Sequence, residues 1–240
     1  MNPLSYNDLL NEIKLLNNYD VYTCNISNGV AIPVIYRINN NKKTIFIIGG
    51  QHMPIEPAQP VCIIEYLKKY TLKNVNIIAI PVLDVRGIQK RPKENYYRPK
   101  HRIVDGFEFN RGYGNPKKLP EEGLVENFID YLRFGDVVID AHESNWIFRS
   151  NHEVICNFNV INKKYTDIMK SLGLNVVNSK GFTRRIHPPN GTLIKYANKK
   201  WLCGITIELK MNGLFGNSVS FNKRVKLGTD ILHKVIKSVM

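Results

Sequence analysis

Four apolar runs of strand-forming residues constrain the fold of this chain most strongly. They cover residues 44–50, 75–83, 136–142 and 201–209. Strands that are apolar along most of their length are typical of a parallel sheet whose two faces are both covered. Segments with the periodicity of helices separate these runs. The alternation predicts an α/β fold, with a mixed, mostly parallel β-sheet flanked by helices.

The rest of the chain fits the same architecture. Strands are expected over residues 21–29, 30–38 and 152–161. The helical patterns cover residues 5–16, 61–70, 123–134, 162–174, 193–200 and 221–239. Residues 84–120 show no periodicity, and loops of this length are commonly functional. Because neither a repeat nor a linker interrupts the pattern, residues 1–240 are expected to form a single domain.

The charge balance favours anionic partners. Lys and Arg number 34 against 20 Asp and Glu, a formal net charge of +14. Nucleic acid, an acidic membrane surface, an anionic cell-wall polymer and a substrate with several carboxylates all remain open. The basic residues are scattered along the whole chain, which a compositional bias would also produce. Charge alone therefore does not choose among these partners, and nucleic acid is disfavoured because no recognised binding motif is found.

The sequence carries no sign of export or membrane insertion. The first twenty residues lack the apolar stretch of a signal peptide. No run approaches the length of 18 apolar residues that would indicate a membrane span. We therefore expect a cytoplasmic protein that makes no use of a membrane.

Two strand ends carry residue types that bind zinc. His52 and Glu56 follow directly on one apolar run, and His142 ends another in the sequence DVVIDAHES. Two imidazoles and one carboxylate leave the fourth position of a tetrahedral zinc ion open, which is the arrangement of a catalytic site. Each residue alone has an ordinary structural explanation, but the combination favours a site for one Zn²⁺ ion formed by His52, Glu56 and His142.

Two further groups could take part in the chemistry. Glu208 interrupts the apolar run ITIEL, where an acid costs free energy unless it is paired or functional. It could serve as a general base toward the zinc water, or simply alternate outward with Thr206. In the long loop, Asn110 and Arg111 could bind a carboxylate, because a guanidinium forms two parallel hydrogen bonds with that group.

The order of these motifs resembles the zinc carboxypeptidase family, in particular its compact members such as murein peptide amidases. The resemblance rests on the His/Glu pair, PVLDVRG, DGFEFNR, DAH and TIE, and extends over roughly residues 45 to 210. It implies that zinc is bound by His52, Glu56 and His142. It also implies that Asn110 and Arg111 hold the substrate's terminal carboxylate, and that Glu208 activates water.

The same resemblance implies an arginine that stabilises the oxyanion. Arg91, Arg98 and Arg102 precede the Asn-Arg pair, and we prefer Arg98 for this role. Arg184 and Arg185 precede the loop HPPNG, which in the family borders the pocket for the substrate's terminal side chain. The expected partner is a peptide or small amide with a free carboxylate, with an acidic cell-wall peptide as the specific hypothesis.

One departure from the family leaves alternatives open. The family spacing is H-x-x-E, whereas three residues separate His52 from Glu56 here. The extra residue could be absorbed by the loop, or it could weaken the zinc site. One alternative is therefore an inactive scaffold that binds an anionic polymer. The other is an N-acyl amino acid deacylase of the aspartoacylase and succinylglutamate desuccinylase type, which shares the His, Glu, His, Glu order.

Overall fold

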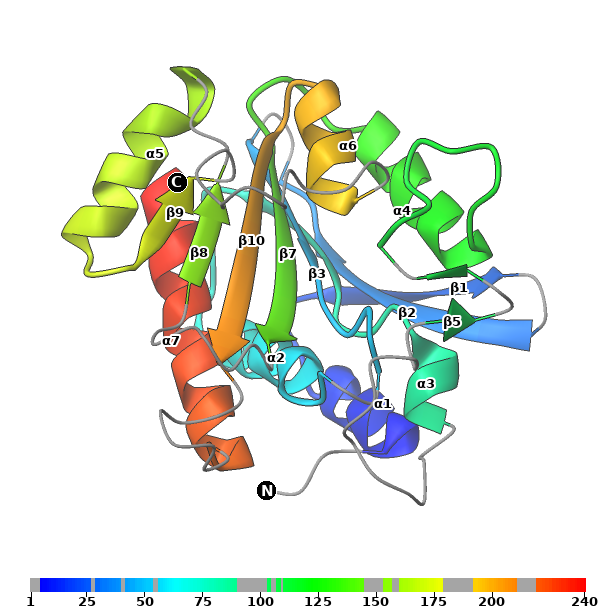
Figure 1. Ribbon diagram of the computed structural model, residues 1–240. Coiled ribbons are helices and arrows are strands. Elements are labelled where there is room, and N and C mark those ends of the chain that lie inside the picture. Colours follow the sequence, from blue (N-terminus) through cyan, green and yellow to red (C-terminus); the bar gives the residue numbers. More distant parts are fainter. Residues whose placement is uncertain are drawn as a thin grey trace.

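A mixed sheet of eight strands forms the centre of the protein in the computed structural model (Figure 1). Its order is β1-β2-β4-β3-β7-β10-β8-β9, and β5 and β6 form a separate two-stranded hairpin. The strands are β1 Asp20–Ile26, β2 Val30–Arg37, β3 Thr44–Ile48, β4 Asn76–Ile80, β5 Ile103–Val104, β6 Phe107–Glu108, β7 Val137–Ser144, β8 Glu153–Cys156, β9 Val176–Asn178 and β10 Cys203–Lys210. The structure describes residues 5–26, 29–39, 42–53, 56–89, 103–104, 107–108, 110–144, 153–156, 160–178, 192–210 and 219–240.

The centre of the sheet is parallel and part of its periphery is antiparallel. β3 pairs in parallel with β4 and with β7, and β7 pairs in parallel with β10. β1 and β2 form an antiparallel hairpin that joins β4, while β8 runs antiparallel to β10. This arrangement confirms the predicted α/β fold with a mixed, mostly parallel sheet.

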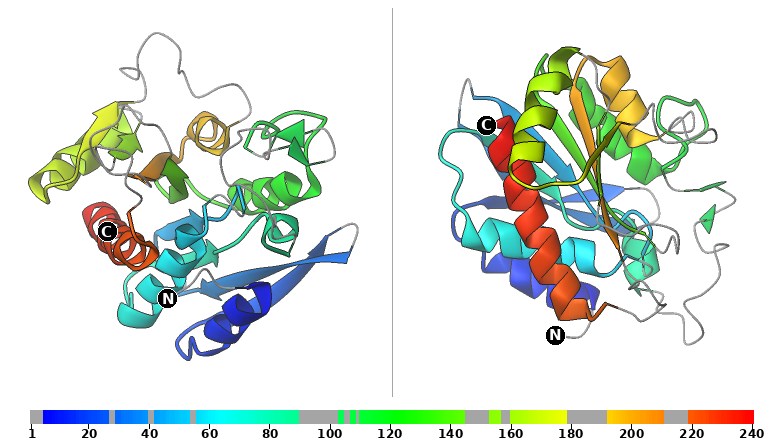
Figure 2. Two further views of the ribbon diagram at one scale, coloured as in Figure 1. Left: turned by 60° about the horizontal axis from the view of Figure 1, so that its bottom comes forward. Right: turned by 60° about the vertical axis from the view of Figure 1, so that its left-hand side comes forward.

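Helices cover both faces of the sheet (Figures 1 and 2). They are α1 Tyr6–Lys14, α2 Ala58–Lys69, α3 Val85–Gln89, α4 Pro120–Asp130, α5 Val160–Ser171, α6 Leu193–Lys199 and α7 Phe221–Val239. α2 and α7 pack on one face, with α1 beside α2 and α5 beside α7, whereas α4 and α6 lie on the other. Within the described part of the chain, no helix has the length and apolar character needed to cross a membrane.

Burial along the strands follows their position in the sheet. Every residue of β3 is buried, because β3 is central and helices cover both its faces. β1 lies at an edge and is mostly exposed. The core therefore consists of two layers, one on each side of the central parallel strands, and the apolar runs of the sequence form those strands.

Some predicted boundaries were wrong. The strand expected over residues 152–161 ends at Cys156, and Val160 already belongs to α5. Apolar residues at the start of an amphipathic helix resemble the end of a strand when read in isolation. The long loop contains α3 and the β5–β6 hairpin, whose segments were too short to give a periodic signal. α4 begins at Pro120, three residues before the predicted start.

Candidate metal centre

The carboxyl ends of β3 and β7 lie side by side at a switch point of the sheet. β4, the strand that follows β3 in the chain, joins one side of β3, and β7 joins the other. Ligands of open α/β sheets bind in the crevice outside the carboxyl ends of strands at such a point. Gly50, just after β3, has a φ of 55°, a conformation that glycine adopts without a steric penalty. The turn that follows places His52 at the carboxyl ends of β3 and β7.

Three potential metal ligands meet at the carboxyl ends of these strands. His52, Glu56 and His142 are all buried, and one ligand atom from each lies within 4.8 Å of the others. Nδ1 of His142 is 3.1 Å and 3.2 Å from the two carboxylate oxygens of Glu56. The two imidazole rings are stacked, with their centroids 5.1 Å apart. The extra residue between His52 and Glu56 therefore does not prevent convergence of the side chains.

The spacing of these donors fits a zinc ion. With bonds of about 2.0–2.1 Å, adjacent ligands of a tetrahedral zinc are roughly 3.3 Å apart. The distances from Nδ1 of His142 to the Glu56 oxygens are close to that value. Two imidazoles and one carboxylate also match the ligand set of catalytic zinc sites, which keep one position open. These residues fit the metal that the sequence predicts.

Two carboxylates surround the ring of His142. Burial lowers the pKa of His142, but the charges of Asp140 and Glu56 raise it more, so the pKa lies well above its ordinary value. Nδ1 faces Glu56, and Nε2 lies 2.9 Å from Oδ1 of Asp140. The site is thus strongly attractive to positive charge, whether that charge is a proton or a metal ion.

Glu208 lies next to the cluster in the sheet. On β10 it is in register with His142 of the parallel strand β7, and residues paired in this way project from the same face of a sheet. Its side chain is partly exposed, as is that of Thr206, while the intervening Ile207 is buried on the opposite face. The register therefore brings Glu208 to the same face and the same edge as His142.

Glu143 points away from this site, although it follows His142 directly. One of its carboxylate oxygens accepts a hydrogen bond of 2.7 Å from the backbone N–H of Ala58, and the other pairs with Arg224. Burial raises the pKa of Glu143 to about 7, while Arg224 lowers it. Glu143 consequently ties β7 to α2 and α7 and does not join the metal cluster.

The predicted carboxylate-binding pair adjoins the cluster. Asn110 is buried, with a φ of 61°, and its amide nitrogen is 3.2 Å from both Asp140 Oδ2 and His142 Nε2. Its amide oxygen accepts a hydrogen bond of 2.7 Å from the N–H of Leu193. Arg111 donates from its guanidinium to the carbonyl of Asn110 at 2.7 Å. Both polar atoms of the Asn110 amide are therefore used in contacts within the protein, whereas the side chain of Arg111 is partly exposed to solvent.

Buried acids of α4, which the sequence analysis missed, hold this loop. Glu122 accepts hydrogen bonds from the backbone N–H groups of Arg111 at 3.2 Å and Gly112 at 2.9 Å. Glu126 accepts another from Gly114 at 2.6 Å. The only hint in the sequence is three acids among the first seven residues of the helix, PEEGLVE, a pattern equally typical of an exposed helix start. These hydrogen bonds hold the backbone of the loop, including that of Arg111, in place.

Solved structures with similar folds were found, although no family model and no curated protein matches the sequence. A metallo-carboxypeptidase from Burkholderia cenocepacia superposes with a TM-score of 0.73 at 15% identity, covering 99% of this chain and 70% of that one. The metallo-carboxypeptidase from Pseudomonas aeruginosa in complex with (2-guanidinoethylmercapto)succinic acid gives 0.73 at 14%, covering 99% and 70%. Bovine thrombin-activatable fibrinolysis inhibitor gives 0.72 at 13%, covering 98% and 95%. The chain has the zinc carboxypeptidase fold.

Several arginines expected to complete the site cannot be placed on this carboxypeptidase fold. Arg98 and its alternatives Arg91 and Arg102 lie outside the described residues, and so do Arg184 and Arg185. Their predicted contacts with an oxyanion and with an acidic side chain stay predictions. The structure brings together His52, Glu56, His142, Asn110 and Arg111, with Glu208 in register beside them.

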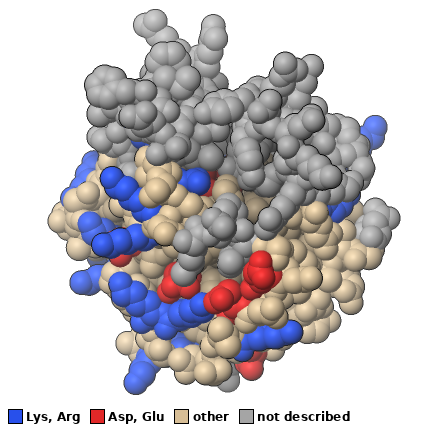
Figure 3. Space-filling view, turned by 90° about the horizontal axis from the view of Figure 1, so that it is seen from below, with Lys and Arg blue, Asp and Glu red and all other residues tan. Residues whose placement is uncertain are grey.

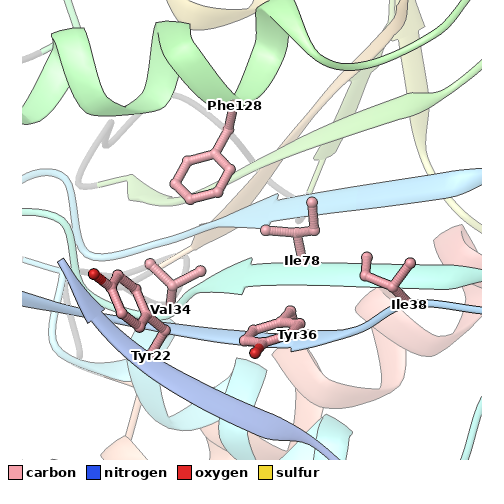
Figure 4. A pocket seen from close by; sticks show the side chains of 6 residues that line it. All are labelled: Tyr22, Val34, Tyr36, Ile38, Ile78 and Phe128. Atoms are coloured by element: carbon pink, nitrogen blue, oxygen red, sulfur yellow. The ribbon is translucent and has the colours of Figure 1, made fainter.

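The described part of the carboxypeptidase fold also has an apolar pocket away from this centre. It has a volume of about 320 Å³ and lies between α4 and the strands β1, β2 and β4 (Figure 4). Its lining consists of Tyr22, Val34, Tyr36, Ile38, Ile78 and Phe128. None of the metal-centre residues contributes to it.

Basic side chains cover part of the surface at the carboxyl edge of the sheet. Seen from below, the direction in which β3, β7 and β10 point, Lys and Arg gather on the left and lower parts of the surface (Figure 3). Asp and Glu side chains occur nearer the middle of the same view. Lys223 and Lys226, at the start of α7, are among the exposed basic residues of the chain. The charge of +14 is thus partly displayed on the face that carries the metal centre.

Proposed function

We propose that this protein is a zinc-dependent hydrolase that cleaves a peptide or amide bond next to a free carboxylate. The observation that carries the proposal is the buried cluster of His52, Glu56 and His142 at the switch point of a carboxypeptidase fold. Buried carboxylates and imidazoles at this density are costly without a cation to bind. A zinc ion held there supplies Lewis-acid polarisation of the scissile carbonyl and lowers the pKa of a bound water.

The chain's own residues supply the proton transfers and the substrate contacts. Glu208 takes the proton of the attacking water and later gives it to the leaving amine, a role supported by its register beside His142. Arg98 shares the charge of the oxyanion, as the family resemblance implies. Arg111, with Asn110 beside it, holds the terminal carboxylate of the substrate, since a guanidinium binds that group through two hydrogen bonds.

The substrate is proposed to be acidic. The net charge and the basic side chains on part of the surface at the carboxyl edge favour an anionic molecule. The Pseudomonas aeruginosa neighbour was solved with a succinic acid derivative, which shows a carboxylate-bearing molecule in complex with that protein. Arg184 and Arg185 are proposed to select an acidic terminal side chain, and a cell-wall peptide containing glutamate or diaminopimelate is the specific candidate.

Hydrolysis of matched peptides tests this function. Zinc-loaded protein should cleave an acidic peptide with a free terminal carboxylate and leave the same peptide with a terminal amide largely intact. Glu208→Gln should lower kcat by roughly 10²- to 10⁴-fold, because general-base catalysis is removed. Glu65→Gln removes an acid from the surface of α2 and serves as the matched control, with full activity expected.

Two outcomes would change the proposal. Full activity of Glu208→Gln would reject the assigned mechanism. Turnover of N-acyl amino acids without turnover of peptides would favour the deacylase alternative, because both classes share the same order of His and Glu residues. A protein without activity that binds an anionic polymer in a strongly salt-dependent manner would favour the inactive scaffold.

A further inference from the structure

Asp140 is a buried acid of β7 that the proposed reaction does not use. It is 1% exposed and lies two residues before His142, on the same face of the sheet. Its Oδ1 is 2.9 Å from Nε2 of His142, the ring nitrogen that faces away from Glu56. Asp140 therefore contacts the side of the imidazole opposite to the proposed metal.

Two amide side chains fix Asp140 in this position. Gln51 donates from Nε2 to Oδ1 of Asp140, and Asn110 donates from Nδ2 to Oδ2 at 3.2 Å. The amide orientations are set by second contacts: Tyr113 donates to the oxygen of Gln51 at 3.2 Å, and Leu193 donates to that of Asn110 at 2.7 Å. Both oxygens of the carboxylate thus accept hydrogen bonds from groups that are themselves held in place.

Both ring nitrogens of His142 face a carboxylate, since Nδ1 lies 3.1 Å from Glu56 and Nε2 lies 2.9 Å from Asp140. A carboxylate accepts hydrogen bonds, so without a metal each contact favours a proton on its nitrogen. Glu56 is itself a proposed metal ligand, so a bound metal would take the place of the Nδ1 proton and leave the remaining proton on Nε2, toward Asp140. The amide nitrogen of Asn110, which is 3.2 Å from Nε2, then donates to Asp140. Hydrogen bonds of this kind orient histidine ligands and make them more basic in metal sites.

We propose that Asp140 is a positioning residue that keeps the proton on Nε2 of His142 and thereby presents Nδ1 to the metal. The inference rests on the proposed zinc function, and it adds residues that contact the ligand His142 and not the metal itself. Gln51 and Asn110 hold Asp140, so Asn110 acts on the metal ligand as well as lying beside Arg111. Asp140 touches neither the substrate nor the metal in this scheme.

Zinc affinity measured by competition with a chelator tests the proposal. Asp140→Asn and Asp140→Ala should bind zinc about 10- to 100-fold more weakly than the unmodified protein, with Ala at least as weak as Asn. Asp136→Asn alters a buried aspartate at the other end of β7 and should leave the affinity unchanged. In cobalt-substituted protein, the absorption bands should shift in the Asp140 variants and not in Asp136→Asn.

A second measurement needs no variant of Asp140. Nitrogen-15 NMR of the histidine rings in the zinc-loaded protein should show the His142 proton on Nε2, with the His142 signals identified by their loss in His142→Gln. A proton on Nδ1, or Asp140 variants with unchanged affinity and cobalt spectrum, would overturn the role of Asp140 and leave the zinc function standing. Absence of zinc binding by the unmodified protein would overturn both proposals.

Discussion

One buried aspartate directly precedes strand β7 and another lies in the middle of the strand, and the two acids are used differently. Asp136, which directly precedes the strand, is 3% exposed and accepts hydrogen bonds from the backbone N–H groups of Thr44 at 2.7 Å and Arg133 at 2.8 Å. Asp140 is 1% exposed and accepts from the side chains of Gln51 and Asn110, with His142 as its third partner. The first acid is bonded to the backbone and the second to side chains.

The kind of donor that each aspartate binds indicates whether that aspartate contributes to the stability of the fold or to the metal centre. Backbone donors connect Asp136 to β3 and to the turn after α4, so its carboxylate joins neighbouring elements of the fold. Side-chain donors orient Asp140 toward the His142 ring, which in our proposal presents Nδ1 to the metal. The amino end of β7 is therefore expected to govern folding, and the carboxyl end to govern metal binding. Experiments on the metal ligand His142 and on the buried aspartates test this division.

The largest effect is expected at the carboxyl end. His142→Ala removes one of three protein ligands and should weaken zinc binding by roughly a thousandfold, on the basis of total zinc-binding free energies of about 10–16 kcal/mol shared among the ligands. Chelator competition and elemental analysis provide the measurement. His233→Ala, a histidine of α7 away from the cluster, is the control and should keep the affinity. Unchanged zinc content in His142→Ala would remove His142 from the metal centre.

The next effect concerns a third buried aspartate and the dependence of stability on pH. Burial raises the pKa of Asp84 to about 7, although the N–H of Gly87 donates to it at 2.8 Å. Because the folded-state pKa is above that of the unfolded chain, the stability contributed by Asp84 is present below about pH 4 and is lost as the pH rises through 7. The loss should be on the order of 2–4 kcal/mol.

Urea unfolding of metal-free protein between pH 4 and pH 8 checks this expectation. Asp84→Asn should flatten the decline of stability with pH. Part of the decline should remain, because the pKa of Glu143 is also raised to about 7 and acts in the same direction. Asp20→Asn, an exposed aspartate of β1, should leave the pH profile unchanged. A profile in Asp84→Asn identical to that of the unmodified protein would contradict the assignment.

The smallest effect is expected at the amino end of β7. Asp136→Ala leaves the backbone donors of Thr44 and Arg133 without their acceptor and should lower the free energy of unfolding by about 1–3 kcal/mol. Zinc affinity of the folded variant should stay the same. Thermal and urea unfolding measure the first quantity and chelator competition the second. A large loss of zinc affinity in Asp136→Ala would show that the two ends of β7 are coupled.

The sequence predicted much of the fold because local patterns dictate it. The apolar runs that form β3, β4, β7 and β10 are expected to be buried strands in any sheet order, because an exposed position would leave their apolar side chains in water. Short elements such as β9 and the β5–β6 hairpin gave no such signal, because two or three residues are too few for a period to be recognised.

The candidate ligands were also predictable, because residue type at a strand end carries their chemistry. His52, Glu56 and His142 could be named without knowing the sheet order. By contrast, the sequence DAHES offers two acids beside the histidine, and the pleat of β7 decides their roles. Asp140 faces His142 and the metal cluster, and Glu143 faces α2 and α7, because strand residues separated by an odd number of positions lie on opposite faces.

Local patterns are enough to specify the layers of this protein, its central strands and the types of ligand at their ends, because hydrophobic periodicity and residue chemistry are local properties. Which of these residues act together depends on the packing of the whole chain. Gln51, Asn110 and Asp140 come from segments separated by 30 to 89 positions, and their hydrogen bonds exist only once β3 and β7 pair. Contacts of this kind depend on directions fixed by packing, which no local pattern specifies.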